Sequence, residues 1–274
     1  MPTFGSRLQD AMGQLGPLCA GIDPHPGLLE SWGLTDDVAG LAKFTELCVD
    51  AFIGTVALVK PQVAFFEAYG SGGLAVLERA IADLRGAGTL VLADAKRGDI
   101  GSTMDAYARA WLGDGPLGSD SVTVSPYLGF GSLAPALELA ERNGRGLFVL
   151  AATSNPEGAQ VQRARDADGR TVAQGIVEEC ARRNAGHEFG SVGIVLGATL
   201  TEPLDVSGLG GPILMPGVGA QGGGAESIRA LVPESALRLV VPNASREVLT
   251  AGPTVEALRA KVGALQEDFA FLRA

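Results

Sequence analysis

The amino-acid sequence predicts an α/β fold, specifically a (β/α)8 TIM barrel. Short apolar runs alternate with segments of helical periodicity along all 274 residues, and eight such pairs can be counted. Polar residues concentrate just after the apolar runs, and barrel enzymes draw their active sites from that end of their strands. No linker or shift in composition divides the sequence, so residues 1–274 are expected to form a single domain. A doubly wound open sheet is the alternative fold.

The predicted strands are short apolar runs bounded by glycine, proline or polar residues, as expected of strands buried on both faces of a parallel sheet. They cover residues 18–22, 57–59, 90–93, 122–124, 147–151, 192–196, 213–215 and 237–241. The predicted helices alternate strictly with them and cover residues 3–13, 41–52, 74–84, 100–112, 133–142, 171–183, 225–231 and 255–272. In segment 41–52, for example, Leu41, Phe44, Cys48 and Phe52 recur at the spacing of one helix face.

The composition argues against nucleic-acid and membrane partners. The formal net charge is −10 and the sequence pI is about 4.7, so a basic binding surface is not expected. No apolar run approaches the roughly 18 residues of a membrane span, and the first residues lack the order of a signal peptide. Cys19, Cys48 and Cys180 are far apart and odd in number, which favours reduced thiols in a cytoplasmic protein. With two histidines in the chain, no metal site is expected.

The segment 90–103 carries the clearest chemical signal. Its first four residues form a buried strand, and three charges follow: Asp94, Lys96 and Asp99. Because strand side chains alternate, Asp94 and Lys96 should point the same way, while Asp99 lies just past the turn at Gly98. The pattern predicts a charged site at the carboxyl end of a parallel strand. A solvated ion pair, with Asp99 capping the helix that begins near Ile100, is the alternative.

A second candidate site follows the seventh predicted strand. Residues 216–224 are rich in glycine and lead into a helix, so backbone N–H groups and the helix N-terminus can face an anion. Arg246, after the eighth strand, could clamp the same anion with its planar guanidinium group. The loops after strands seven and eight are the usual phosphate site of this barrel.

Two other interpretations of the glycine-rich segment stay open. Gly217, Gly219 and Gly222 match the dinucleotide fingerprint G-x-G-x-x-G, but the position about 20 residues further on is Asn243 rather than an acid. The segment could also be a flexible turn that binds nothing.

The charged segment resembles the active-site signature of orotidine 5'-phosphate decarboxylase, which it matches from Asp94 to Thr103. Further segments resemble the longer bacterial branch of that family, type 2, in the same order along nearly the whole chain. They are residues 21–25, 59–67, 125–129, 153–158 and 216–223. The resemblance implies a cytoplasmic (β/α)8 homodimer that converts orotidine 5'-monophosphate to uridine 5'-monophosphate and CO2, the last step of de novo UMP synthesis. It implies no metal and no organic cofactor.

The resemblance also implies a role for individual residues. Lys96 would donate the proton to C6 with Asp94 beside it, and Asp99 would reach the partner subunit's site. The remaining implied contacts are Ile100 and Thr103 across the dimer, Asp23 and Lys60 at the ribose hydroxyls, Ser154 at the pyrimidine edge, and Pro216, Gln221, Gly222, Gly223 and Arg246 at the phosphate. The shorter family branch has Arg before Ser after the eighth strand, whereas Ser245 precedes Arg246 here, so the role of Arg246 rests on local alignment.

Two other functions compete with this assignment. A metal-dependent phosphosugar aldolase or decarboxylase of the same barrel would carry an acidic metal ligand after the second strand, where this chain has Lys60. A non-catalytic nucleotide-binding barrel would have no need of the charges at Asp94, Lys96 and Asp99. Decarboxylation does need these charges. The loss of CO2 from C6 leaves an electron pair in the ring plane, which only nearby positive charge and a proton can stabilise.

Overall fold

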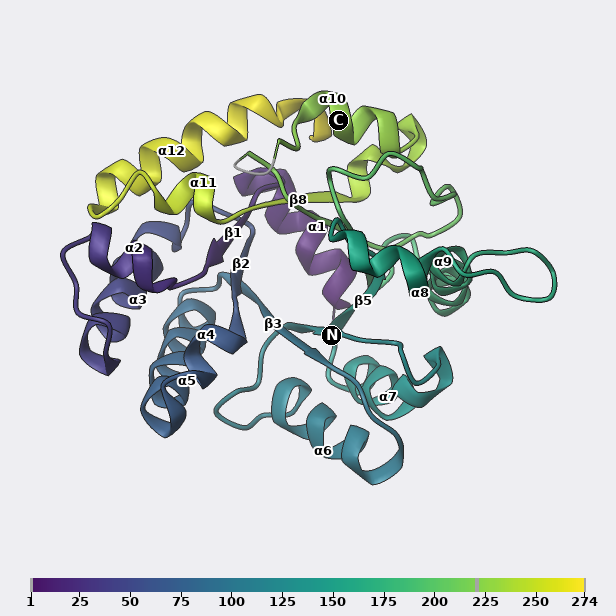
Figure 1. Cartoon of the computed structure of the whole chain (residues 1–274), viewed down its shortest axis with the longest axis horizontal. Coiled ribbons are helices and arrows are strands. Elements are labelled where there is room, and N and C mark those ends of the chain that lie inside the picture. The colour runs from purple at the N-terminus through teal and green to yellow at the C-terminus, as the bar shows by residue number, and fades with distance from the viewer. Residues whose placement is uncertain (1, 220–221, 274) are drawn as a thin grey trace.

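Eight parallel strands close into a barrel in chain order, and the last strand pairs with the first (Figure 1). This computed structural model describes residues 2–219 and 222–273, and the predicted (β/α)8 barrel is confirmed. Within the described residues the strands are β1 (Cys19–Ile22), β2 (Leu58–Pro61), β3 (Leu90–Arg97), β4 (Ser121–Val124), β5 (Gly146–Ala152), β6 (Val192–Leu196), β7 (Ile213–Pro216) and β8 (Val240–Ala244).

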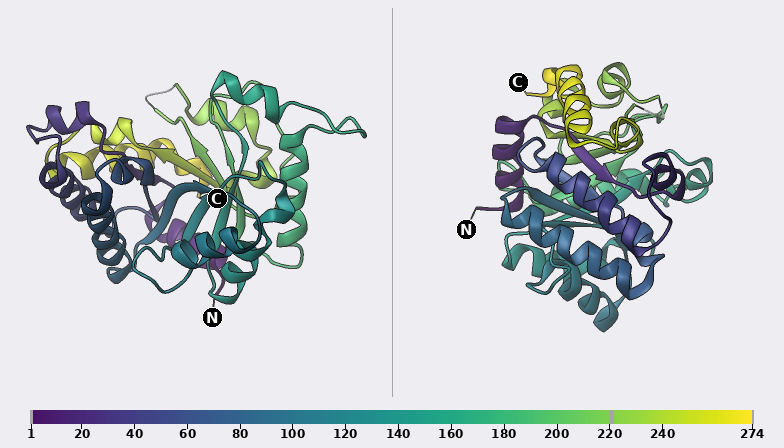
Figure 2. Two further views of the ribbon diagram at one scale, coloured as in Figure 1. Left: turned by 60° about the horizontal axis from the view of Figure 1, so that its bottom comes forward. Right: turned by 90° about the vertical axis from the view of Figure 1, so that its left-hand side faces the viewer.

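Helices surround the barrel on its outer side in the views of Figures 1 and 2. The α-helices are α1 (Phe4–Leu15), α2 (Pro26–Ser31), α3 (Val38–Phe52), α4 (Val63–Glu67), α5 (Gly70–Gly86), α6 (Gly101–Leu112), α7 (Ala134–Arg142), α8 (Ala159–Gln162), α9 (Val172–Asn184), α10 (Ala225–Leu231), α11 (Arg246–Leu249) and α12 (Val255–Asp268). Short 3-10 segments are η1 (Phe130–Leu133), η2 (Pro156–Gly158), η3 (Glu234–Leu239) and η4 (Ala270–Leu272). Along the described part of the chain, no helix combines the length and apolar character that a membrane crossing needs.

Several helices begin where the sequence supplies a side-chain cap. The carboxylate of Asp37 accepts the Gly40 N–H at the start of α3, and the hydroxyls of Thr3, Thr171 and Thr254 do the same for α1, α9 and α12. Each cap satisfies a backbone N–H that has no partner within its helix.

The strict alternation of strand and helix is wrong in detail, because in the described chain no helix separates β6 from β7 and four short helices are present in addition. These are α2, α4, α8 and α11, with four to six residues each. A helix of that length completes too few turns to show an apolar period, so pattern reading assigned these segments to turns. Three of them, α2, α4 and α11, follow β1, β2 and β8 closely and shape the rim of the barrel.

Two predicted strands have an end that is wrong by three residues or more, and both errors affect the site. β3 runs on to Arg97, so Asp94 and Lys96 lie within the strand and not after it. The last strand covers residues 240–244 in place of 237–241, because residues 237–239 belong to η3. Pattern reading ended that strand before Pro242, which has no N–H, yet Pro242 pairs with Met215 of β7. Asn243 is consequently a strand residue.

The core has two layers that follow the period-two alternation of the strands. One cluster joins α1 to the inner side of the barrel and contains Phe4, Leu8, Cys19, Leu58, Phe148, Leu214 and Val241. The neighbouring strand residues Ala20, Val59, Ile213 and Val240 belong to the larger cluster beneath the outer helices. The inner layer therefore closes the barrel at the end where α1 packs.

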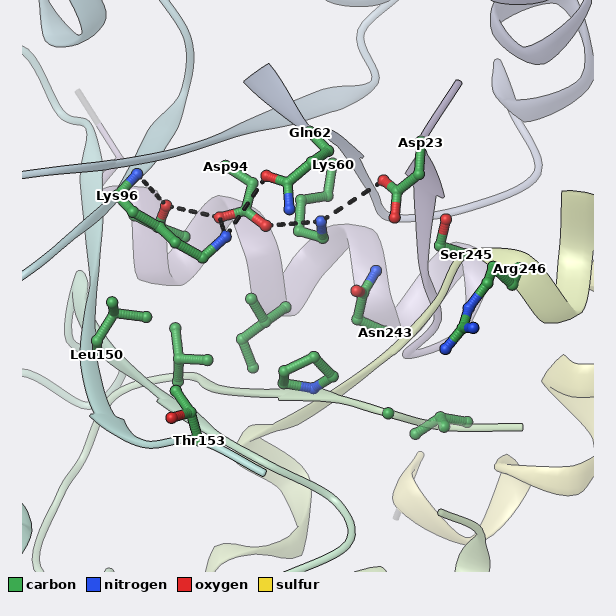
Figure 3. A pocket seen from close by; sticks show the side chains of 16 residues that line it. Asp23, Lys60, Gln62, Asp94, Lys96, Leu150, Thr153, Asn243, Ser245 and Arg246 are labelled. Atoms are coloured by element: carbon green, nitrogen blue, oxygen red, sulfur yellow. Dashed lines mark hydrogen bonds and ion pairs between the residues drawn. The ribbon is translucent and has the colours of Figure 1, made fainter. Parts of the chain in front are cut away.

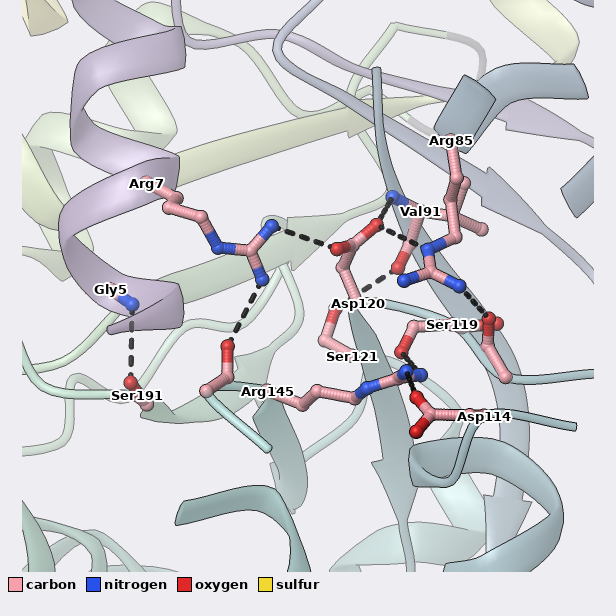
Figure 4. A network of polar contacts seen from close by, with 12 residues as sticks. Gly5, Arg7, Arg85, Val91, Asp114, Ser119, Asp120, Ser121, Arg145 and Ser191 are labelled. Atoms are coloured by element: carbon pink, nitrogen blue, oxygen red, sulfur yellow. Dashed lines mark hydrogen bonds and ion pairs between the residues drawn. The ribbon is translucent and has the colours of Figure 1, made fainter. Parts of the chain in front are cut away.

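An ion pair to a buried carboxylate and a hydrogen bond fix α1 across the amino ends of the strands (Figure 4). Asp120, which is 5% exposed, accepts a 2.8 Å hydrogen bond from Arg7 of α1 and a 3.1 Å hydrogen bond from the Val91 N–H of β3. The Arg85 guanidinium lies 3.5 Å from the same carboxylate, and Gly5 N–H donates to the Ser191 hydroxyl just before β6. With this end closed by α1, the opposite end is the open one.

Candidate active site

A cavity opens at the carboxyl ends of the strands and is lined by residues from most of the barrel (Figure 3). Its polar lining residues are Asp23, Lys60, Gln62, Asp94, Lys96, Thr123, Thr153, Asn243, Ser245 and Arg246, and its other lining residues are Leu150, Val195, Leu214, Pro216, Gly217 and Val218. The side chains of Asp23, Lys60, Asp94 and Lys96 lie along one wall, opposite Leu150 and Thr153. Such a cavity suits a ligand with one apolar part and several polar groups.

The Asp94 carboxylate is the centre of the charged wall. Its Oδ2 accepts a hydrogen bond of 2.8 Å from Lys60 Nζ, and its Oδ1 accepts bonds of 2.6 Å from Lys96 Nζ and 2.8 Å from the Thr123 hydroxyl. When the oxygen and nitrogen of the Gln62 amide are interchanged, which satisfies both atoms, the nitrogen donates to the Asp94 backbone oxygen at 2.7 Å and to Oδ2 at 3.1 Å. The carboxylate is 8% exposed, and these donors compensate for the loss of water.

Lys60 is the buried cation of this wall, with 3% of its surface exposed. Its Nζ lies between Asp94 Oδ2 at 2.8 Å and Asp23 Oδ1 at 3.9 Å. Burial works to lower the pKa of Lys60, but the carboxylates of Asp94 and Asp23 outweigh it and raise that pKa above its ordinary value. Burial likewise works to raise the pKa of Asp94, and the charges of Lys60 and Lys96 reverse the effect and lower it. Both groups are therefore charged at neutral pH.

Lys96 differs from Lys60 in reaching solvent. Its side chain is 43% exposed, and its ammonium is held at one point by Asp94 Oδ1. The next residue, Arg97, does not line the cavity. It pairs with Glu67 and lies over the rings of Tyr107 and Trp111. The predicted common direction of Asp94 and Lys96 is thus confirmed by their 2.6 Å contact.

Two oxygen atoms at the β1 and β8 ends face the cavity without a hydrogen-bond partner among the described residues. Asp23 Oδ1 and Ser245 Oγ are buried, and neither forms a hydrogen bond with the part of the chain that the structure describes. Buried polar atoms are nearly always satisfied in folded proteins. A carboxylate and a hydroxyl in this state, both lining the cavity, fit a ligand that carries hydroxyl groups.

The glycine-rich segment after β7 forms a tight loop. Gly217, Gly219 and Gly222 have φ angles of 97°, 76° and 89°, which residues with a Cβ rarely adopt. Gly223 N–H donates to the Gly217 carbonyl at 3.0 Å, and a Cβ on Gly223 would lie 2.7 Å from that oxygen. The loop leads into α10, and Pro216 and Gly217 line the cavity together with Arg246.

The structure brings together some of the residues that the sequence singled out and not others. Asp23, Lys60, Asp94, Lys96, Pro216 and Arg246 line one cavity. Ser154 lines a neighbouring cavity, which shares Thr153 with the first. Gly222 and Gly223 lie further along the loop and outside the lining, and Gln221 falls outside the described residues.

Asp99, Ile100 and Thr103 do not line the cavity of their own chain. Asp99 Oδ1 accepts the Ile100 N–H at 2.8 Å, and Ile100 is the N-cap residue of α6, so Asp99 supports the helix start without being its cap residue. Ile100 is 62% exposed, and Thr103 is exposed as well. Asp99 and Ile100 lie between β3 and α6, and Thr103 lies in the first turn of α6.

Sequence reasoning missed five polar lining residues: Gln62, Thr123, Thr153, Asn243 and Ser245. Thr123 is the one polar residue in the apolar run Val122–Thr123–Val124, and Asn243 Nδ2 donates to the Cys19 carbonyl of β1 at 3.1 Å. For Thr123 the signal was a polar side chain in a segment expected to be buried, where a polar group requires a partner. Asn243 was expected after the end of its strand, so no such signal marked it. The partner of Thr123 depends on the register between strands.

Comparisons with known proteins agree over nearly the whole chain. Residues 16–261 match the model of the family described as orotidine 5'-phosphate decarboxylase / HUMPS. The chain is 57% identical over 272 residues to the orotidine 5'-phosphate decarboxylase of Corynebacterium efficiens, with 97% of each chain covered. It is 59% identical over 262 residues to that of Salinispora tropica, with 94% of each covered. The crystal structure of a candidate orotidine 5'-phosphate decarboxylase from Streptomyces avermitilis is 54% identical, with a TM-score of 0.95 and coverage of 100% of this chain and 97% of that chain.

Proposed function

The chain belongs to the orotidine 5'-phosphate decarboxylase / HUMPS family, and from this premise we infer that it converts orotidine 5'-monophosphate (OMP) to uridine 5'-monophosphate (UMP) and CO2 in pyrimidine biosynthesis. The observation that carries this function is the pairing of Lys60 and Lys96 with one buried carboxylate, Asp94, at the open end of the barrel. A cation that is fixed and yet reaches the cavity is what a decarboxylation without an electron sink requires.

Lys96 is the proton donor in the mechanism we propose. When the bond between C6 and the carboxylate breaks, CO2 leaves and its bonding electron pair stays on C6 in the ring plane, outside the π system. The Lys96 ammonium stabilises this charge and then transfers a proton to C6, which forms the C6–H bond of UMP. The resulting neutral amine takes a proton back from solvent, which its 43% exposed side chain can reach.

Asp94 holds the Lys96 ammonium in place and also repels the carboxylate of the substrate. Its 2.6 Å contact with Lys96 Nζ limits the positions that the ammonium can take, which favours the geometry of proton transfer. Its negative charge would also lie near the carboxylate of bound OMP and raise the energy of that state. We give this repulsion second place, because fixed positive charge at the developing carbanion acts on the transition state directly.

The rest of the nucleotide would occupy the other lining residues. We propose that Asp23 and Lys60 hold the ribose hydroxyls, which is supported by the buried Asp23 Oδ1, an atom that accepts no hydrogen bond from the described chain. Ser154 would contact the pyrimidine edge from the adjoining cavity. The phosphate would lie against Pro216, Gln221, Gly222, Gly223 and Arg246, of which Pro216 and Arg246 line the cavity. Binding energy from this remote group can lower the barrier by ordering the charged wall.

We further propose a homodimer in which Asp99, Ile100 and Thr103 reach the partner's cavity. Support comes from exposed apolar side chains on this part of the rim: Ile100 is 62% exposed, Tyr127 77% and Leu128 53%. The two loops that carry them are adjacent, because Ser125 N–H donates to the Arg97 carbonyl at 2.8 Å. A cluster of exposed apolar residues next to a polar site is typical of a protein–protein contact.

The proposal includes four further features of the working enzyme. It acts as a single domain over residues 1–274, in the cytoplasm, and without a metal ion or organic cofactor. Three free buried cysteines, Cys19, Cys48 and Cys180, are compatible with a reducing compartment. The ammonium of Lys60 at the end of β2, already paired with Asp94, gives a metal ion no ligand at that point.

Replacing the proton donor tests the function directly. We expect Lys96→Ala to lower kcat by about 10⁴-fold or more, since it removes both the acid and the charge that meets the carbanion. UMP binding should persist. The assay is the loss of OMP absorbance, with and without EDTA, using Lys43→Ala on the exposed side of α3 as the matched control. Near-normal turnover by Lys96→Ala would refute the role of Lys96, and EDTA-sensitive activity on a sugar phosphate would favour the metal-dependent alternative.

Arg246 should act mainly through the phosphate. We expect Arg246→Ala to raise KM for OMP by about 10- to 100-fold, the effect of losing one charge-assisted contact, with a smaller change in kcat. The same substitution should have little effect on orotidine, which lacks the phosphate. Steady-state kinetics on both substrates measure this, with Arg142→Ala of α7 as the control. An unchanged KM for OMP would remove Arg246 from the phosphate site.

The shared site predicts complementation between two damaged chains. Lys96→Ala and Asp99→Ala homodimers should each be impaired, but a mixed dimer contains one site with both residues intact. After dissociation and reassembly of an equal mixture, activity should recover to at most about one quarter of the wild-type level, because half of the dimers are mixed. If mixing recovers nothing while native mass spectrometry detects mixed dimers, Asp99 does not serve the partner's site.

A further inference from the structure

The ladder between β3 and β4 is irregular at the charged wall. Leu92 pairs with Ser121 and Ala93 with Val122, but the next pair is Arg97 with Val124. Between the last two pairs, the three residues 94–96 of β3 therefore lie opposite the single residue Thr123 of β4. A bulge of this kind redirects side chains and is frequent beside active sites.

At this bulge the backbone of Lys96 adopts an unfavourable conformation. Its φ angle is 48°, and among the described residues it is the one non-glycine residue with a positive φ. Side chains with a Cβ rarely adopt this left-handed region, so neighbouring groups must hold it. The direction in which the Lys96 side chain leaves the strand depends on keeping this conformation.

Thr123 contacts both functional residues of the bulge with one hydroxyl group. Its Oγ1 accepts the Lys96 backbone N–H at 2.9 Å and donates to Asp94 Oδ1 at 2.8 Å. Thr123 is 1% exposed, so water cannot replace either bond easily. One buried hydroxyl thus links the strained backbone of Lys96 to the carboxylate that receives the Lys96 ammonium.

We propose that Thr123 is a positioning residue for the decarboxylation, acting through Lys96 and Asp94 without touching the substrate's reacting atoms. The inference rests on the proposed function of Lys96 as the proton donor. Thr123 holds the bulge in the geometry in which the Lys96 ammonium meets both Asp94 Oδ1 and the cavity. Its loss lets the ammonium move away from the position that C6 requires.

Two substitutions separate the hydroxyl from the rest of the side chain. Thr123→Val keeps the volume but leaves the Lys96 N–H without its acceptor and takes one donor from Asp94. Thr123→Ser keeps the hydroxyl and loses a methyl group. Thr45→Val is the matched control, because Thr45 of α3 is also buried, at 2% exposure, and its hydroxyl donates within its own helix to the Leu41 carbonyl.

The experiment is steady-state kinetics on OMP, together with UMP affinity and thermal unfolding of each variant. We expect Thr123→Val to lower kcat by about 10- to 100-fold, the usual effect of misplacing a catalytic group by about 1 Å. KM and the UMP dissociation constant should change by less than about threefold, since Thr123 does not bind substrate. Thr123→Ser should restore kcat to within about threefold of wild type, and Thr45→Val should leave it unchanged.

Several results would overturn this role. Wild-type kcat in folded Thr123→Val does so, and so does a Thr123→Ser variant as impaired as Thr123→Val, because the hydroxyl would then not matter. If Thr123→Val does not fold, Thr123→Ala takes its place, and failure of both to fold assigns Thr123 to stability instead. If the wild-type protein does not decarboxylate OMP in the same assay, the proposed function itself has failed, which is a distinct result.

Discussion

The Asp94 carboxylate is the interaction on which the site depends. It is buried, and four side chains donate to it: Lys60, Gln62, Lys96 and Thr123. These donors come from β2, the residue after it, β3 and β4, so one carboxylate ties three neighbouring strands together at the open end of the barrel. Removing a partner from such a group leaves an uncompensated buried charge, which costs more than the pair contributes when complete. The positions of the two lysine side chains and the stability of this end of the barrel therefore depend on the same carboxylate.

Much of the fold could be predicted from the sequence because its strands are buried on both faces. Apolar runs between polar turns located all eight strands, and residues 192–196 were predicted with the bounds that β6 has. The errors in the predicted strand ends occur where the local sequence pattern indicates one end and the pairing with the neighbouring strand sets another. Pro242 looked like the end of a strand, but β8 pairs through it, and η3 takes the apolar residues before it.

The site could be predicted only in part, for a related reason. Alternation along β3 predicted that Asp94 and Lys96 point the same way, but their contact also depends on the bulge opposite Thr123 and on the left-handed backbone of Lys96. The register between β3 and β4 decides that Thr123 faces them, and no pattern within either strand encodes it. Asp99, Ile100 and Thr103 lie outside their own chain's cavity, so their predicted role requires a second copy of the chain.

The most direct test of this account compares wild-type protein with Asp94→Asn in urea unfolding at one protein concentration from pH 7 to pH 2.5. Because the lysines lower the pKa of Asp94 in the folded state, its contribution is fully present above the ordinary Asp value of about 3.9 and is lost as pH falls through the folded value. We expect the wild-type protein to be more stable by about 3–5 kcal/mol at pH 7, the usual cost of breaking a buried ion pair. The difference should shrink steadily as pH falls below that ordinary value toward pH 2.5. Equal stability at pH 7, or a difference that stays constant into acid, would contradict the central role of this carboxylate.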